Sequence, residues 1–251
     1  MLKRIAFATV VGVLSVAAAS AGAIVDTFQA VESLDNNSAS LPFRLMDGVC
    51  PGVASTFGGC RDTTLWLDSG SGDNTLVFGN GTMRIDAAAG SQVGVYLIYD
   101  DNTDGNIGGS LNSDLWASGN QFTLFISNTS WDAVGAPNYS PIGELGVWSS
   151  GGAQLTFWDF ELPLPGASEL VEIPFASGPA WTMGGGANLH QVNAITLSFN
   201  QTNNFVTGLQ ADVSSFDIDT AAASSTPEPA TWGIAGAALL GLGFLRRRVV
   251  R

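Results

Sequence analysis

Short runs of alternating apolar and polar residues recur through the middle of the chain, separated by spacers rich in Gly, Ser, Asn and Asp. A period of two residues is typical of a β-strand that buries one face. The region from Ile24 to Ser225 shows no sustained helical period, so it predicts an all-β fold. The runs predict strands at residues 63–68, 75–78, 82–86, 93–99, 121–127, 154–162, 170–175, 194–200 and 213–219.

Two of these runs carry additional information. Gly79, Asn80 and Gly81 separate two strand patterns, which favours a tight hairpin. Residues 93–99 are apolar on both faces, so we expect a central strand that is covered on both sides. Many short strands in about 200 residues indicate a single β-sandwich, with jelly-roll topology as the expected form.

The N-terminal segment has the organisation of a secretory signal. A positive start precedes an apolar run at residues 5–16, and Ala21 and Ala23 form a small-residue cleavage site. We therefore expect a signal helix in residues 1–23 and a mature chain that starts at Ile24. The alternative is an uncleaved N-terminal anchor.

The C-terminal segment is apolar and then strongly basic. Residues 230–245 contain Thr231 as their only polar side chain, and Arg246, Arg247 and Arg248 follow directly. As a helix these sixteen residues would cover about 24 Å, which snorkelling arginines can extend toward a bilayer of about 30 Å. The alternatives are an ordinary single-pass anchor and a buried amphipathic helix. The buried helix is disfavoured, because the apolar residues extend all the way round the helix and the basic block follows at once. We predict one transmembrane helix whose arginine stop signal stays cytoplasmic.

The tripeptide Pro227, Glu228 and Pro229 stands directly before this span. Together, the tripeptide, the Gly- and Ala-rich span and the arginine cluster resemble the PEP-CTERM sorting signal of Gram-negative bacteria. The resemblance covers residues 226–251 only. It implies that an exosortase, a membrane protease or transpeptidase, recognises and processes an inner-membrane-anchored precursor. The product would then reach the cell surface or the extracellular space.

These segments leave residues 24–225 as the exported domain, and its charge is one-sided. It contains no lysine and three arginines, Arg44, Arg61 and Arg84, against 21 acidic residues, a net of −18. Such a surface repels phosphate backbones, so nucleic acid is not an expected partner. It is compatible with solubility and with divalent cations.

Cys50 and Cys60 are the only cysteines. In an exported chain two cysteines at this short separation predict a disulfide. Because the loop between the two cysteines is short, this disulfide would stabilise the folded state by about 2–3 kcal/mol at most. A metal site is not expected here, because neither another cysteine nor a histidine accompanies the pair.

One loop has half of a calcium-binding pattern. Asp100, Asn102 and Asp104 place oxygen ligands at positions 1, 3 and 5, and Gly105 follows at position 6. The second half departs from the pattern, because position 12 is Leu111 rather than Glu. Calcium is therefore the one candidate cofactor, and a solvated loop after a buried strand is the alternative.

A second possible oxygen site combines Asp26 with Asp217 and Asp219, if the first and last strands are neighbours; solvation at the surface is the alternative.

His190 is the only histidine, which excludes a histidine-rich zinc site. The sequence also lacks a Gly-x-Ser-x-Gly nucleophile motif, so we expect no enzyme activity. A pair of glycosidase carboxylates remains open, because spacing in sequence does not give distance in space.

Trp131 and Trp181 stand in segments rich in Gly and Pro, where we expect exposed loops. Exposed indole rings stack on sugars, so these two residues are candidate ligand contacts, with core packing as the alternative. Several short segments also resemble, in their order, jelly-roll carbohydrate-binding modules, which implies the fold. They are residues 24–28, 58–62, 171–175, 192–197 and 215–219.

Three functions are compatible with these observations. The first is a non-catalytic structural protein of the envelope or of a biofilm matrix, with an exosortase as its processing partner. The second is a carbohydrate-binding protein for exopolysaccharide. The third is a secreted glycan hydrolase.

Overall fold

The computed structural model describes residues 23–36, 43–50, 57–107, 110–133, 142–200 and 206–220, within one compact unit that ends at Thr220. Residues 1–22 of the expected signal helix, including the cleavage-site residue Ala21, lie outside the described residues. So do the tripeptide at 227–229 and the expected C-terminal helix with its arginine cluster. Ala23, which was expected to end the signal helix, is instead the first residue of a strand that pairs with the last strand of the domain. Among the described residues no helix has the length and apolarity needed to cross a membrane.

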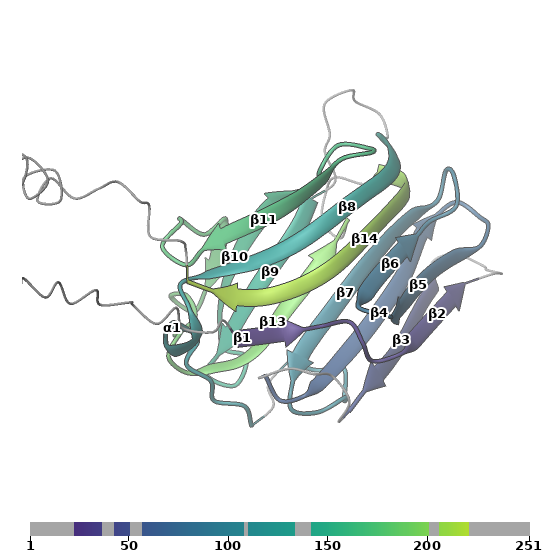
Figure 1. The fold of residues 1–251 in the computed structure, drawn as a ribbon. Helices are drawn as coiled ribbons and strands as arrows, with labels where there is room; N and C mark the ends of the chain where they lie inside the picture. The colour runs from purple at the N-terminus through teal and green to yellow at the C-terminus, as the bar shows by residue number, and fades with distance from the viewer. Residues whose placement is uncertain are drawn as a thin grey trace, which may run out of the picture. The chain divides into compact units, whose positions relative to one another are not determined.

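The described residues form two antiparallel sheets that pack face to face (Figure 1). The first, which we call the β14 sheet, has the strand order β11 (Ser168–Pro174), β8 (Gln121–Ala133), β14 (Val206–Asp219), β6 (Thr82–Asp86), β5 (Asn74–Gly79) and β2 (Glu32–Asn36), and β1 (Ala23–Asp26) also pairs with β14. The second, the β13 sheet, has the order β12 (Trp181–Met183), β10 (Gln154–Glu161), β9 (Ile142–Ser149), β13 (Val192–Phe199), β7 (Gln92–Asp100), β4 (Cys60–Ser69) and β3 (Phe43–Val49). A four-residue helix, α1 (Leu115–Ser118), precedes β8.

The chain crosses repeatedly between the sheets, as in a jelly roll, so the predicted all-β sandwich is confirmed. Each predicted strand coincides with or overlaps a strand of the structure. The expected hairpin joins β5 to β6, with positive φ angles at Asn80 and Gly81. The expected central strand is β7, which pairs with β4 and β13.

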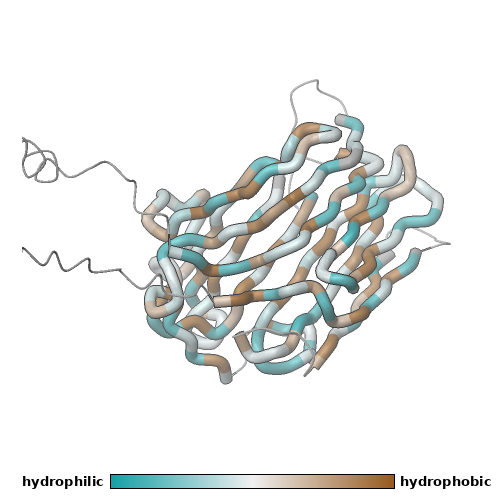
Figure 2. Tube along the Cα trace, viewed as in Figure 1, coloured by the Kyte–Doolittle hydropathy of each residue, from teal (hydrophilic) through white to brown (hydrophobic). Residues whose placement is uncertain are grey.

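Apolar side chains from both sheets fill the space between them, and hydrophobic positions alternate along the strands (Figure 2). Aromatic rings form the middle of this core. Phe122 packs against Phe216 and Trp158, and Tyr99 meets Phe216 edge to face. Trp158 is therefore a core residue.

The predicted disulfide between Cys50 and Cys60 is present, with 4.4 Å between the Cα atoms. Cys50 directly follows β3 and Cys60 begins β4, and the two strands are antiparallel neighbours. The bond therefore closes the connection between β3 and β4 at the edge of the β13 sheet.

A buried ion-pair cluster joins the two sheets near this edge. Arg61 on β4 is fully buried, and its guanidinium donates to Asp26 on β1 at 2.5 Å and to Glu32 on β2 at 2.8 Å. Thr63 donates to the same Glu32 oxygen at 3.0 Å, and the guanidinium lies 3.6 Å from the centre of the Phe78 ring. Burial raises the pKa of Glu32, although Arg61 acts to lower it.

We predict that Arg61→Leu lowers the free energy of unfolding by about 3–5 kcal/mol, because it leaves two buried carboxylates without their cation. The matched control is Arg84→Leu, which removes a solvent-exposed pair with Asp212 and costs at most about 1 kcal/mol. Urea unfolding at pH 7 measures both losses. Equal losses in the two variants would contradict the assigned role of the buried cluster.

Candidate functional site

The outer face of the β13 sheet carries a row of aromatic side chains. On each strand the core-facing positions alternate with positions that point away from the β14 sheet. Five of the six consecutive strands from β12 to β4 place one aromatic residue each on this outward side, whereas β13, between β9 and β7, places Thr196 and Ser198 there. We call this surface the aromatic face. Its rings are Trp66 on β4, Tyr96 on β7, Trp148 on β9, Phe157 on β10 and Trp181 on β12.

Contacts between these rings make one end of the row continuous. Phe157 stacks on Trp181 with 6.0 Å between ring centres, and Trp148 meets Phe157 edge to face at 6.2 Å. Trp181 is 54% exposed, so its ring is open to solvent.

Two glycines allow rings to lie against the backbone of the sheet. A Cβ atom on Gly94 would stand 2.2 Å from the indole nitrogen of Trp66. A Cβ atom on Gly146 would stand 2.3 Å from the Thr196 hydroxyl and 2.8 Å from the Phe157 ring. The aromatic rings therefore occupy the space that other residues at positions 94 and 146 would fill.

Hydrogen bonds connect the aromatic face to polar groups on the same side of the sheet. The indole nitrogen of Trp148 donates to the Thr196 hydroxyl at 3.2 Å, and Ser198 donates to Glu144 at 3.3 Å. Burial raises the pKa of Tyr96 to about 12, although its hydrogen bond with Thr196 acts in the opposite direction. The phenol is therefore protonated at neutral pH and can act as a donor.

Of the two predicted ligand-contact residues, only Trp181 belongs to the aromatic face. Trp181 is exposed as expected, but the expectation of loops was wrong for both, since Trp181 lies in β12 and Trp131 in β8. Trp131 packs partly buried against the core, because β8 continues beside β14 as far as Ala133. Its indole nitrogen is buried without a hydrogen-bond partner.

The predicted oxygen site of Asp26, Asp217 and Asp219 is not formed. The first and last strands do pair, but the register shifts between Ile24 and Asp26. This shift places Asp26 opposite Phe216 and turns its carboxylate inward to Arg61.

The loop after β7 adopts a series of side-chain-capped turns. Asp100 accepts from the backbone nitrogen of Asn102 at 3.0 Å, and Asn102 accepts from that of Asp104 at 2.9 Å. Asp62 on β4 lies beside the loop and accepts from the nitrogen of Gly105 at 3.3 Å. Asp62 carries no local signal of this contact, because it stands 38 residues before Asp100 and only strand pairing brings the two together. Within the described ranges, no three His, Cys, Asp or Glu side chains form a group ready to hold a metal ion.

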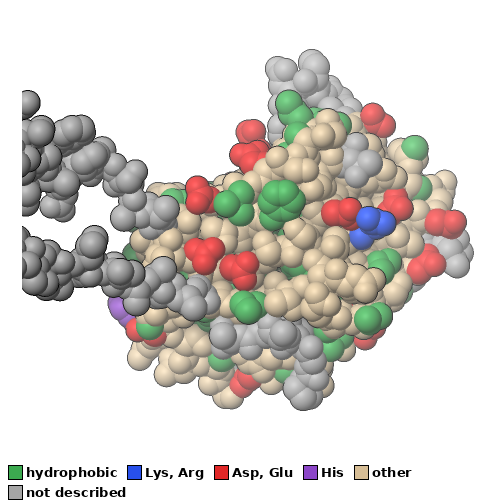
Figure 3. Space-filling view, in the orientation of Figure 1, with side chains coloured by type: hydrophobic (Ala, Val, Ile, Leu, Met, Phe, Trp, Pro, Cys, Tyr) green, Lys and Arg blue, Asp and Glu red, His purple; other side chains and the backbone are tan. Residues whose placement is uncertain are grey.

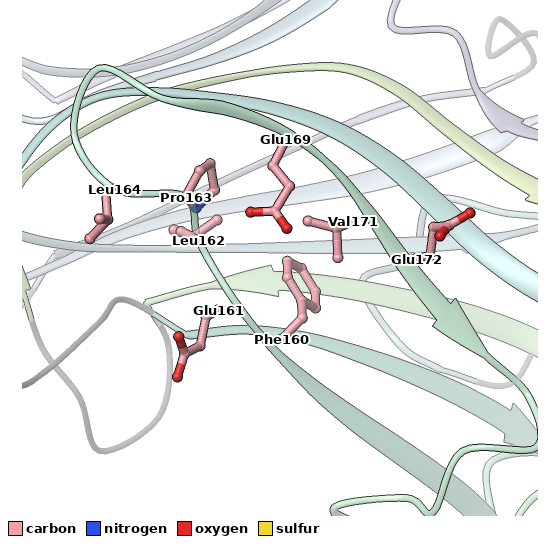
Figure 4. Close-up of a pocket in the computed structure, with 8 residues that line it drawn as sticks. All are labelled: Phe160, Glu161, Leu162, Pro163, Leu164, Glu169, Val171 and Glu172. Carbon is pink, nitrogen blue, oxygen red and sulfur yellow. The ribbon is translucent and has the colours of Figure 1, made fainter.

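A cavity of about 340 Å³ lies under the connection from β10 to β11. Apolar side chains such as Phe160, Leu162 and Val171 form part of its lining, together with three glutamates (Figure 4). Figure 4 shows the carboxylate of Glu169 turned toward Val171, whereas Glu161 and Glu172 extend to opposite sides. The three carboxylates therefore do not converge on one point.

His190 has a structural contact. Its Nδ1 atom lies 3.0 Å from the carboxylate of Asp114, which caps the N-terminus of α1. The hydrogen bond from His190 lowers the pKa of Asp114. The contact is exposed and connects the turn before β13 to α1.

One family model matches the sequence, and it covers the C-terminal segment. Residues 225–248 match the PEP-CTERM protein-sorting motif. This motif indicates an exported precursor that is held at the membrane before it is processed. None of the curated proteins matches the chain at a significant level.

Several solved structures are similar to the chain. The family 11 carbohydrate-binding module from Clostridium thermocellum, in complex with a β-1,3-1,4-mixed-linked tetrasaccharide, is 14% identical over 80% of this chain and 98% of that chain, with a TM-score of 0.38. The agarase AgWH50C is 12% identical over 63% of this chain and 23% of its own, with a TM-score of 0.39. These similarities do not assign a ligand.

We predict that Gly146→Ala destabilises the protein by about 1–3 kcal/mol, because the added Cβ displaces the Thr196 hydroxyl and the Phe157 ring. The control is Gly178→Ala, where a Cβ atom meets nothing within 4 Å and the change stays within about 0.5 kcal/mol. Chemical denaturation followed by tryptophan fluorescence measures both. A neutral result for Gly146→Ala would show that the ring does not rest on that backbone.

Proposed function

We propose that this protein is an exported, non-catalytic surface protein that binds polysaccharide through its aromatic face. The observation that carries the proposal is the placement of five aromatic residues from five strands on one side of the β13 sheet, staggered along the strands by the register. Aromatic rings present apolar surface together with polar edges, which suits the alternating CH and OH groups of sugars. The runner-up is a structural role in the envelope or a biofilm matrix without sugar binding.

The size of the face favours a polymer over a single sugar. From β12 to β4 the row crosses five strand spacings, or about 24 Å at roughly 4.8 Å each. A chain that runs across the strands could meet the rings in succession. Each ring would contribute a modest stacking energy, and the contacts would add along the polymer.

The charges beside the rings favour a neutral polysaccharide. Glu144 and the exposed Asp159 point to the same side as the rings, and Arg44 is the nearby cation on β3. Acidic side chains are also spread over the visible face of the β14 sheet (Figure 3). Uronate, sulfate or phosphate groups on a ligand would be repelled by such a surface.

Sorting through the C-terminal motif supports the exported location. We propose that an exosortase recognises Pro227, Glu228 and Pro229 in an inner-membrane-anchored precursor of a Gram-negative cell. The processed domain would then act at the cell surface or in the extracellular matrix.

We predict that Trp66→Ala and Trp181→Ala each weaken binding to an insoluble or gel-embedded neutral glycan about 10-fold or more, roughly 1.4 kcal/mol. Affinity electrophoresis of the mature protein against a panel of neutral and anionic polysaccharides measures this effect. The control is Phe125→Ala, which removes a 40% exposed ring from the opposite sheet and leaves binding unchanged. Absence of binding to every glycan, or equal weakening by Phe125→Ala, would favour the structural alternative.

We predict that intact mass measurement of the processed protein finds Ile24 at the N-terminus and a C-terminus that lacks the arginine cluster. Glu228→Ala is expected to retain the tail in the membrane fraction, because the sorting tripeptide is lost. Glu161→Ala, an exposed glutamate of the domain, serves as the control and is processed normally. A wild-type chain that keeps Met1 or Arg251 in its final location would contradict this route.

A further inference from the structure

Two buried carboxylates lie side by side at the end of the β13 sheet. Asp62 on β4 is 5% exposed and Asp100 on β7 is fully buried. Asp62 is directly opposite Ile98, so Asp100 is its diagonal neighbour on the same outward side of adjacent strands. Diagonal neighbours are about 7–8 Å apart at the backbone, so a single ion between the two side chains can reach both.

Within the described residues, neither carboxylate forms an ion pair. The ion pairs formed within the described part of the chain use Asp26, Glu32, Asp114 and Asp212. One oxygen of Asp100, Oδ2, is buried and accepts no hydrogen bond. A buried carboxylate oxygen without a donor or a cation is unfavourable, so binding a positive ion at this site would lower the free energy of the folded protein.

The loop after β7 holds further oxygen atoms next to this pair. Its Asn102 and Asp104 side chains follow at alternate positions, and Gly105 adopts φ +74 where the chain turns back to Asp62. On the other side Gly48 of β3 lets the loop pack closely, since a Cβ atom there would stand 2.9 Å from the Thr103 side chain and 3.2 Å from an Asp62 oxygen. Carboxylate, amide and water oxygens are the ligands that calcium prefers, whereas magnesium demands a smaller octahedral shell.

We propose that Asp62 and Asp100, with loop oxygens from Asn102 and Asp104, form a calcium-binding site that links β4, β7 and the loop. No group of three acidic, His or Cys side chains is preformed among the described residues, and calcium ligands of this kind include water. The affinity therefore belongs to the weak class of extracellular modules, with a Kd of about 0.1–1 mM. The site lies on the same outward side of the β13 sheet as the aromatic face, but none of its proposed ligands is one of the five rings.

Thermal unfolding of the mature protein tests the proposal. Changing from chelator to 10 mM calcium is expected to raise the Tm by about 3–10 °C, and 10 mM magnesium by less than half of that. Asp62→Asn and Asp100→Asn keep the shape of the side chains and should abolish the calcium response. In chelator these variants should melt at or above the wild-type Tm, because an unpaired buried charge has been removed.

Asp73→Asn is the charge-matched control, because Asp73 is exposed in the turn before β5 and should leave the calcium shift unchanged. A wild-type shift below 1 °C would overturn the proposal. An equal loss of the shift in Asp73→Asn would also overturn it, since it would indicate general screening of an acidic surface. If the site variants do not fold, calorimetric titration of the wild type decides: one calcium per chain is expected, and no heat or several weak equivalents would refute the site.

Discussion

The buried pairing of Arg61 with Asp26 and Glu32 is the constraint on which the arrangement of the two sheets depends. It is the point where the first two strands, both in the β14 sheet, are joined by charge to a strand of the β13 sheet. A buried guanidinium without these partners would be strongly unfavourable, so the cluster selects one way of closing the sandwich. The Phe78 ring under the guanidinium supplies a further favourable contact from β5.

The closing of the sandwich also explains why the strands of the β13 sheet can present an aromatic outer face. The core takes the inward residues of β4, β7, β9 and β13, which are mostly apolar, and leaves the outward side of these strands free to differ. The outer side then buries its small polar residues, including Thr196 and Ser198, beneath large rings. Rigid strands hold each ring at a defined spacing, which is the property that a polymer-binding surface requires.

The acidic surface and the buried carboxylates beside the loop after β7 both reflect the small number of cations in the domain. A domain with three arginines, no lysine and many carboxylates has few internal cations, and Arg61 is fully used in the core. Carboxylates that are buried elsewhere, such as Asp62 and Asp100, must then be neutralised by protons or by ions from solution. Outside the cell calcium is a ready source of that charge, which connects the expected location to the proposed site.

The strand pattern, the hairpin at Gly79–Gly81 and the Cys50–Cys60 bond followed from local sequence, because period-two alternation, turn residues and short cysteine spacing act over a few neighbours. The sorting motif at 225–248 was also readable, since its parts are contiguous. The aromatic face could not be predicted from the sequence, because both sides of β10 are apolar. Only packing decides that Trp158 turns inward and Phe157 outward. The meeting of Asp62 with Asp100, and of Asp26 with Arg61 rather than with Asp217, depended on long-range pairing and on a register shift in β1. Alternation along a strand gives two faces but not their neighbours, and those neighbours are set only when the sheets assemble.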